Sequence, residues 1–329
     1  MRNSPRTEAA HTRILRGPPL IKRTLEISRE PAHLSVRHKQ FVLKRDGDVV
    51  GSFPCEDLGM VVVDHPQTTY SHAALAALAE SDAALVVCGR DHLPAAVLLP
   101  LADHSQVVWR VQAQVAAKKP LQKRLWKQLV QAKIRAQAEN LPAGSPRKKL
   151  LALAADVRSG DPSNREAQAA RVYWAHWLLH PDREVSDEQF RRARDGDGPN
   201  ALLNYGYAIL RAAVARALVG SGLLPSLGIQ HSHRANAFCL ADDLMEPLRP
   251  LVDARVRDLY WDGGTELDQP TKAALLELLA EPVATSGTTG PLMVALHTLS
   301  ASLAKCYEGT ANELEIPTAC RSADTVACG

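Results

Sequence analysis

The pattern of apolar residues changes near residue 102, and this change constrains the fold more than any other feature. Before that point, short runs of β-branched and aromatic residues dominate, as at 41–43, 60–63 and 85–87. After it, apolar residues recur every three or four positions, which is typical of amphipathic helices. The sequence therefore predicts an α+β protein, with a small N-terminal β-sandwich-like domain followed by a larger all-α domain.

The chain has 329 residues, enough for two domains. We expect a flexible basic arm over 1–22, where Arg, Pro and Gly are frequent, and a β-rich domain over 23–102. An α-helical domain is expected over 103–317, and a disordered tail over 318–329, where small polar residues dominate.

Local signals refine this division. Asp46-Gly47-Asp48 lies between apolar runs and predicts a hairpin, because Asp and Gly tolerate the positive φ angles of tight turns. Gly287-Thr288-Thr289-Gly290 lacks the Lys-Ser/Thr of a phosphate loop, and we expect it to open a helix at Pro291. Helices are expected over 71–79, 104–117, 120–141, 163–179, 185–193, 200–220, 240–258, 270–280 and 291–308, with a kink or a new start at Pro247 and Pro250.

Composition excludes several classes of protein. The six cysteines include no C-x-x-C pair, which argues against a zinc ribbon or a thioredoxin-like site. We find no apolar run of about 18 residues and no secretory signal, so we expect no membrane span and a cytoplasmic location. The net charge of +3 does not announce a nucleic-acid binder, but two blocks are basic. Residues 1–45 carry 11 Lys/Arg against 3 acids, and residues 115–150 carry 10 against 1.

A cluster of acids near residue 245 is the strongest chemical signal. Asp243 and Glu246 are three residues apart and Asp242 and Glu246 four, so on a helix these acids share a face. The same helix needs a buried face for the apolar Leu244 and Leu248. Carboxylates this close repel one another unless a cation lies between them. His231 lies just upstream, and hard carboxylates with one imidazole suit Mg²⁺ or Mn²⁺. The alternative is a helix start whose acids merely favour the helix dipole.

Local reasoning leaves two further assignments open. His231 and His233 compete for the ligand position, and nothing in the spacing decides between them. Glu166 lies among small residues that permit close helix packing, but a Glu here could equally pair with Arg165 or Arg171.

Several segments, in order along residues 30–317, resemble the integrase of CRISPR adaptation, especially its type II forms. The matching residues are Trp126, Ala132-Lys133-Ile134, Arg165-Glu166-Ala167, Ala170-Arg171-Val172-Tyr173, Asn204-Tyr205-Gly206-Tyr207, Gly228-Ile229 with His231, Asp243-Leu244-Met245-Glu246-Pro247 and Arg249-Pro250. Each motif alone is weak, but their common order is specific. Members of this family have an N-terminal β domain and a helical catalytic domain, as expected above.

The resemblance implies a site and an activity. It assigns the catalytic metal to Glu166, His231 and Glu246, with Asp243 as a supporting acid, and gives His233 no role. The implied enzyme is a metal-dependent endonuclease and integrase that joins a DNA 3′-hydroxyl to a phosphodiester of the CRISPR repeat. Six basic residues are candidate contacts to the DNA backbone: Lys123, Arg124, Lys127, Lys133, Arg192 and Arg194.

The implied partners are double-stranded DNA, both spacer precursor and repeat, and a second copy of the chain. Two homodimers would assemble with a small ferredoxin-like CRISPR-associated protein into a hetero-hexamer, with other type II CRISPR proteins as further candidates. Two other functions stay open: a stand-alone metal-dependent nuclease for branched or damaged DNA, and a non-catalytic DNA-binding scaffold.

Overall fold

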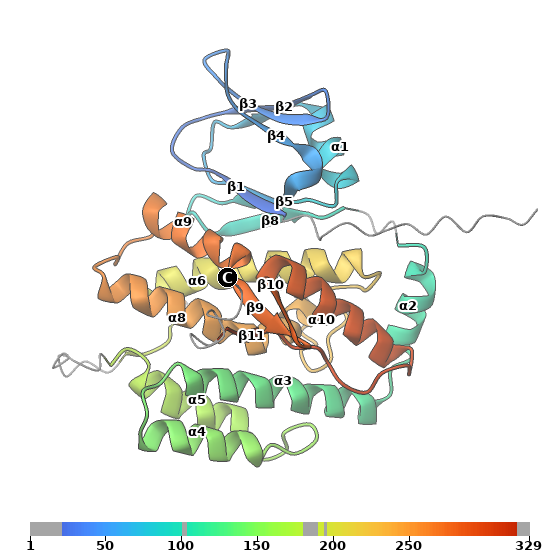
Figure 1. Ribbon diagram of the computed structural model, residues 1–329, viewed down its shortest axis with the longest axis vertical. Helices are drawn as coiled ribbons and strands as arrows, with labels where there is room; N and C mark the ends of the chain where they lie inside the picture. Colours follow the sequence, from blue (N-terminus) through green and yellow to red (C-terminus); the bar gives the residue numbers. More distant parts are fainter. Residues whose placement is uncertain (1–21, 101–103, 180–189, 194–195, 321–329) are drawn as a thin grey trace, which may run out of the picture.

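The computed structural model describes residues 22–100, 104–179, 190–193 and 196–320, and shows a β unit stacked on a larger helical unit (Figure 1). The expected arm therefore lies outside the described residues, except for residue 22. Most of the helix expected over 185–193 lies outside them as well, and residues 190–193 are not helical.

Two four-stranded sheets form the N-terminal unit. One has the order β1-β5-β7-β8 and the other the order β4-β3-β2-β6. The strands are β1 (Arg23–Ile27), β2 (His33–Arg37), β3 (Gln40–Arg45), β4 (Asp48–Pro54), β5 (Leu58–Val63), β6 (Thr69–Tyr70), β7 (Ala84–Cys88) and β8 (Pro94–Leu98). Short helices η1 (Cys55–Asp57) and α1 (His72–Glu80) complete the unit. The predicted hairpin joins β3 to β4, and Gly47 takes the positive φ of +92° that the turn requires.

Helices dominate the remainder of the chain. They are α2 (Val107–Val115), α3 (Lys119–Glu139), α4 (Ser145–Ala155), α5 (Arg165–His176), α6 (Pro199–Gly220), α7 (Cys239–Met245), η2 (Glu246–Leu248), α8 (Arg249–Trp261), α9 (Gln269–Glu277), η3 (Leu278–Ala280) and α10 (Leu292–Tyr307). The expected restart near Pro247 is confirmed, because η2 separates α7 from α8. Helix α4 was not predicted; it packs against α3 and α5.

The larger unit is not all-α, which corrects the expectation from sequence. Strands β9 (Pro282–Thr285), β10 (Thr288–Pro291) and β11 (Thr318–Ala319) form an antiparallel sheet in the order β10-β9-β11. The segment 287–290 therefore belongs to a hairpin, and it leads directly into α10, whose N-cap is Pro291 and whose first residue is Leu292. Residues 318–319, assigned above to a disordered tail, pair with β9, whereas 321–329 lie outside the described residues.

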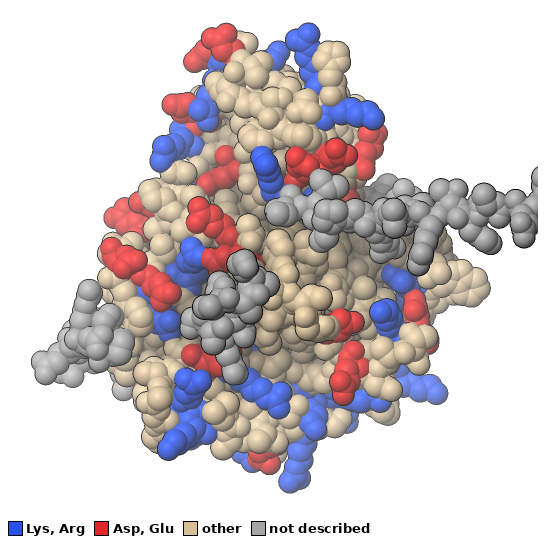
Figure 2. Space-filling model, viewed as in Figure 1, with Lys and Arg blue, Asp and Glu red and all other residues tan. Residues whose placement is uncertain are grey.

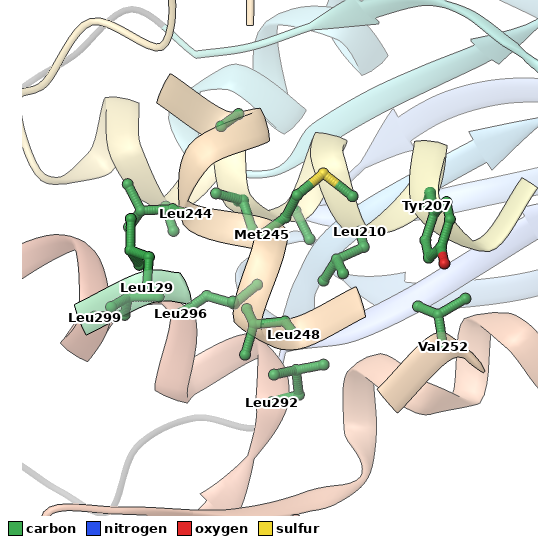
Figure 3. Packing of buried hydrophobic residues seen from close by; sticks show 14 of the residues in the cluster. Leu129, Tyr207, Leu210, Leu244, Met245, Leu248, Val252, Leu292, Leu296 and Leu299 are labelled. Atoms are coloured by element: carbon green, nitrogen blue, oxygen red, sulfur yellow. The ribbon is translucent and has the colours of Figure 1, made fainter. Parts of the chain in front are cut away.

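Helix α6 runs through the centre of the helical unit and contacts α7, α8, α9 and α10. Among the described helices it alone is long and apolar enough for a membrane span, with a mean hydropathy of 1.2, but 78% of that window is buried inside the protein. Gly206 allows α8 to approach closely, because a Cβ there would lie 2.5 Å from Val252. Figure 3 shows Tyr207 of α6 beside Val252 within the core formed by α3, α6, α7, α8 and α10.

Candidate metal site

Three helical elements bring two acids onto one lysine. Lys133 of α3 places its Nζ 2.6 Å from Glu166 Oε1, on α5, and 2.6 Å from Glu246 Oε2, on η2. The two carboxylate oxygens are therefore no further apart than twice that distance. The start of α5 is fixed by Asp161, whose carboxylate accepts hydrogen bonds from the backbone N–H groups of Arg165 and Glu166. Residues far apart in the sequence thus share one small space.

Glu246 is buried, with 5% of its surface exposed. Burial alone would raise the pKa of its carboxyl, but Lys133 and Arg249 outweigh burial and lower this pKa to about 2. The Nε of Arg249 lies 3.1 Å from Glu246 Oε1. The pKa of Lys133 is raised, because Glu246 and Glu166 outweigh the cost of burying its ammonium. Glu246 is thus held as a carboxylate across the neutral pH range.

His231 is oriented by a buried aspartate. Its Nδ1 lies 2.6 Å from Asp243 Oδ1, and the same carboxylate accepts backbone hydrogen bonds from Ile229, Gln230 and His231. The hydrogen bond to Asp243 raises the pKa of His231, and nearby Glu246 adds to this effect. Gly228 permits the close turn, because a Cβ there would lie 2.9 Å from Asp243 Oδ2. With Nδ1 engaged, Nε2 is the ring atom left for a ligand.

The other nearby acid and histidine are placed differently. Asp242 pairs with Arg211 of α6 at 2.7 Å and accepts a hydrogen bond from Asn236, so both of its carboxylate oxygens already have protein partners. His233 is exposed, and its Nδ1 accepts a hydrogen bond from the backbone of Ala235. Of the two histidines, His231 is therefore the one that a buried carboxylate orients.

The donor set fits a hard divalent cation. Glu166 and Glu246 offer carboxylate oxygens and His231 offers an imidazole nitrogen. The Oε2 of Glu246 is buried and makes no hydrogen bond of good geometry, although the Lys133 ammonium lies against it. Among the described residues, no three acidic, His or Cys side chains are already close enough to enclose a metal ion. The ammonium of Lys133 takes the space between the carboxylates, as a cation would.

A cavity of about 730 Å³ opens beside His231. We call it the arginine cavity, because its wall includes Arg192, Arg211 and Arg249, together with Tyr207. His231 also lines a second cavity, of about 440 Å³, which is bordered by α2, α3 and α10. His231 therefore lies where a ligand of substantial size can approach it.

The basic residues proposed from sequence divide into three groups. Lys123 and Arg124 are exposed on α3 and Lys127 is half-buried, and Figure 2 shows Lys and Arg side chains along the part of the molecule built by α3–α5. Lys133 does not face solvent as a DNA contact, which corrects that expectation, because it is engaged by Glu166 and Glu246. Arg192 lines the arginine cavity, and Arg194 lies outside the described residues.

Sequence reasoning missed the residues that join these parts. Arg249, quoted above only as a matching residue, is 4.7 Å from the Tyr207 ring and pairs with Glu246. The Tyr207 hydroxyl donates to Asp253, which is fully buried. Trp126 packs edge-on against His231, with their ring centroids 6.0 Å apart. The one available signal was the i, i+3 spacing of Glu246 and Arg249.

Comparison with known proteins gives one family. The family model described as CRISPR associated protein Cas1 matches residues 25–269. The CRISPR-associated endonuclease Cas1 of Neisseria meningitidis serogroup C is 35% identical over an alignment of 290 residues that covers 86% of this chain and 92% of that protein.

Two solved structures share the fold. A casposase bound to its integration product superposes with a TM-score of 0.72 at 18% identity, over 89% of this chain and 92% of that chain. A Cas6-RT-Cas1–Cas2 complex matches with a TM-score of 0.68 at 17% identity, over 90% of this chain and 36% of that chain. On the family match and the identity to the Neisseria protein, the chain belongs to the family of CRISPR-associated protein Cas1.

Proposed function

We propose that this protein is a metal-dependent DNA integrase and endonuclease that inserts spacer DNA into a CRISPR array. The observation that carries the proposal is the meeting of Glu166 and Glu246 on Lys133, beside a histidine oriented by buried Asp243. Two carboxylates and an imidazole that borders an open cavity are suited to holding a cation where a phosphate can reach it. Membership of the Cas1 family supports the same activity.

Glu166, Glu246 and His231 would hold Mg²⁺ or Mn²⁺. The bound ion supplies charge that polarises a phosphodiester and stabilises the attacking or leaving oxygen. Asp243 keeps the His231 ring in one orientation with Nε2 available, and Lys133 and Arg249 together hold Glu246 ionised. The two cavities that His231 lines would give room for a DNA 3′-hydroxyl and for the strand it attacks.

The proposed partners follow from the family and the fold. Double-stranded DNA, as spacer precursor and as repeat, is the proposed substrate, and the casposase of similar fold, which is bound to its integration product, supports this choice. We propose that the chain works as a homodimer, with two dimers joined by the small ferredoxin-like CRISPR-associated protein. The similarity to a chain solved in a Cas1–Cas2 complex supports this assembly. We further propose that it acts in the cytoplasm.

A strand-joining assay tests the proposal. The protein and its small partner would be mixed with short duplex DNA bearing 3′-hydroxyl ends, a supercoiled repeat plasmid and Mn²⁺. Glu166→Ala, His231→Ala and Glu246→Ala would be compared with wild type and with His233→Ala, the neighbouring histidine that no buried acid orients. We expect joined product from wild type and His233→Ala, and none from the other three variants or after chelation.

Other outcomes would select a different function. Metal-dependent cutting without joining, and without the small partner, would favour a stand-alone nuclease for branched or damaged DNA. DNA binding with no metal-dependent chemistry would favour a scaffold. Normal joining by all three variants would show that the site is wrongly assigned.

A further inference from the structure

Lys133 lies where a metal ion shared by Glu166 and Glu246 would lie. Its Nζ is 2.6 Å from one carboxylate oxygen of each acid. Mg²⁺ bound to protein oxygens lies about 2.0–2.1 Å from them, so an ion placed between these two oxygens would overlap the ammonium. The two cations therefore exclude one another, and the Lys133 ammonium must move before an ion can bind both acids.

The oxygen of Glu246 that faces Lys133 is not firmly held. The Nε of Arg249 lies 3.1 Å from the other oxygen, Oε1. The Oε2 atom is buried and makes no hydrogen bond of good geometry with any residue that the structure describes. Lys133 thus neutralises Oε2 by its charge, and a divalent ion at the same place would attract this oxygen more strongly, because its charge is twice as large.

A buried acceptor without a donor lies one helical turn from Lys133. Gln137 follows Lys133 by four residues on α3, so the two side chains share a face of the helix. Gln137 is 3% exposed, and within the described part of the chain its Oε1 has no hydrogen-bond partner. A buried carbonyl oxygen is costly to leave unpaired, and the lysine ammonium has three N–H groups to donate. Gln137 is therefore a second place at which the ammonium can be bound.

Only the side chain of Lys133 is free to make this movement. Its neighbours on α3, Leu129, Val130 and Ile134, are fully buried and fix the helix in the core. The lysine side chain is a flexible four-carbon stem, whereas side chains on a helix lean toward its N-terminus, which brings Gln137 toward the turn that carries Lys133. A rotation of the lysine side chain can therefore transfer the ammonium from the acids to Gln137.

We propose that Lys133 is a built-in competitor of the metal ion, which neutralises Glu166 and Glu246 until the ion binds and then moves its ammonium to Gln137 Oε1. The inference rests on the proposed function in taking these two acids as metal ligands. Competition weakens the measured metal affinity, because only the fraction of molecules in which Lys133 has moved can bind the ion. Gln137 increases that fraction by giving the displaced ammonium a partner.

Mn²⁺ binding to the full chain, without DNA, tests the proposal. The dissociation constant is obtained from the electron paramagnetic resonance signal of free Mn²⁺, and only the binding that Glu246→Ala abolishes is counted. We expect Lys133→Met to bind Mn²⁺ at least about tenfold more tightly than wild type, because the competitor is gone. Gln137→Leu should bind Mn²⁺ about tenfold more weakly, since the displaced ammonium has lost its acceptor.

A double variant separates competition from general damage to the site. Without the ammonium, Gln137 has nothing to accept, so Lys133→Met combined with Gln137→Leu should bind Mn²⁺ as tightly as Lys133→Met alone. The control is Gln131→Leu, the same substitution on the same helix. The Gln131 amide donates to the Ala154 carbonyl, and its position two residues from Lys133 places it on another face of α3. Its Mn²⁺ affinity should equal that of wild type.

Gln137→Leu keeps every charge of the site, so it tests the proposal by itself if Lys133→Met does not fold. Unchanged Mn²⁺ affinity in Lys133→Met or in Gln137→Leu would overturn the inference, even if wild type joins DNA. An equal loss of affinity from Gln137→Leu with and without Lys133 would overturn it too, as would the absence of Mn²⁺ binding in all of these proteins. The expected affinities in a protein that joins no DNA would uphold the inference and refute the proposed function.

Discussion

Two buried clusters in this protein use the same kinds of side chain for different ends. At the junction of the two units, Lys272 of α9 lies 2.5 Å from Asp64, which also contacts His92 Nδ1 at 2.9 Å. We call these residues the junction cluster. In the candidate metal site, a lysine again meets a buried acid, and a histidine again contacts a buried aspartate through Nδ1.

The clusters differ in their balance of charge. Lys272 meets one carboxylate, and both groups are almost fully buried. Lys133 meets two carboxylates, and one of them is held by Arg249 as well. A one-to-one pair is complete as it stands and joins two elements, whereas two carboxylates that converge on one lysine can accept a further cation. A surplus of carboxylates over paired cations is therefore the more informative sign of a metal site.

The largest effect should separate the two histidines. We expect His231→Ala to lower the rate of strand joining at least about 100-fold, since loss of even an outer-shell partner of a metal ligand typically costs 10–100-fold. His92→Ala removes the same type of contact to a buried aspartate and should leave the rate within about twofold. Rates would be compared at saturating DNA and Mn²⁺. Equal losses of joining rate in the two variants would show that the two clusters do not differ in function.

The two lysines should respond differently to metal. Removing one partner of a buried pair typically costs about 3–5 kcal/mol, because the other charge stays buried. We expect Lys272→Met and Lys133→Met each to lose stability on this scale in chelator, measured by urea unfolding. Mn²⁺ should restore much of the loss in Lys133→Met, since it can occupy the space between Glu166 and Glu246. Restoration of Lys272→Met to the same extent would contradict this view.

Two buried acids, Glu246 and Asp253, should contribute differently to stability as the pH changes, because only Glu246 is paired with cations. Lys133 and Arg249 keep the pKa of Glu246 at about 2, despite burial. Burial raises the pKa of Asp253 to about 7 from 3.8, although Tyr207 and Tyr173 donate hydrogen bonds to it. Asp253 therefore contributes stability that is full below pH 4 and is lost as the pH rises through 7. The loss is on the order of 4 kcal/mol.

Asp253→Asn is the variant that tests this difference, because it removes the titrating group and keeps an acceptor for the tyrosines. The free energy of unfolding would be measured at pH 5 and at pH 8. Its decrease between these two pH values should be smaller in the variant than in wild type. Parallel curves for the two proteins would show that Asp253 is not the group responsible.

The smallest effect should arise in the N-terminal unit. Gly47 has a φ of +92° in the β3–β4 turn, where an L side chain is strained, so Gly47→Ala should cost about 1–2 kcal/mol of stability. Thermal unfolding would measure it. Strand joining by the folded variant should equal that of wild type, because the candidate metal site belongs wholly to the helical unit. A large loss of joining would mean that the two units are more tightly coupled than the clusters suggest.

Much of the secondary structure follows from the sequence. The change of period near residue 102, the hairpin at Gly47 and the restart at Pro247 are all local properties, set by side-chain alternation and by backbone geometry. Helix α4 and the sheet of β9–β11 were missed. The strands are four residues long or shorter, and the last pairs across more than thirty positions, so no local pattern specifies it.

The sequence by itself determined the division into a β-rich part and a helical part, and the residue types of the acidic cluster. By resemblance, it also indicated Glu166, His231 and Glu246 as the candidate metal ligands. Tertiary structure decided which of these meet. Lys133 looks like one more surface cation on a basic helix, yet folding places it between two acids from other elements. The physical reason is that electrostatic pairing depends on distance in space, and packing of α3, α5 and η2 around a common core sets that distance.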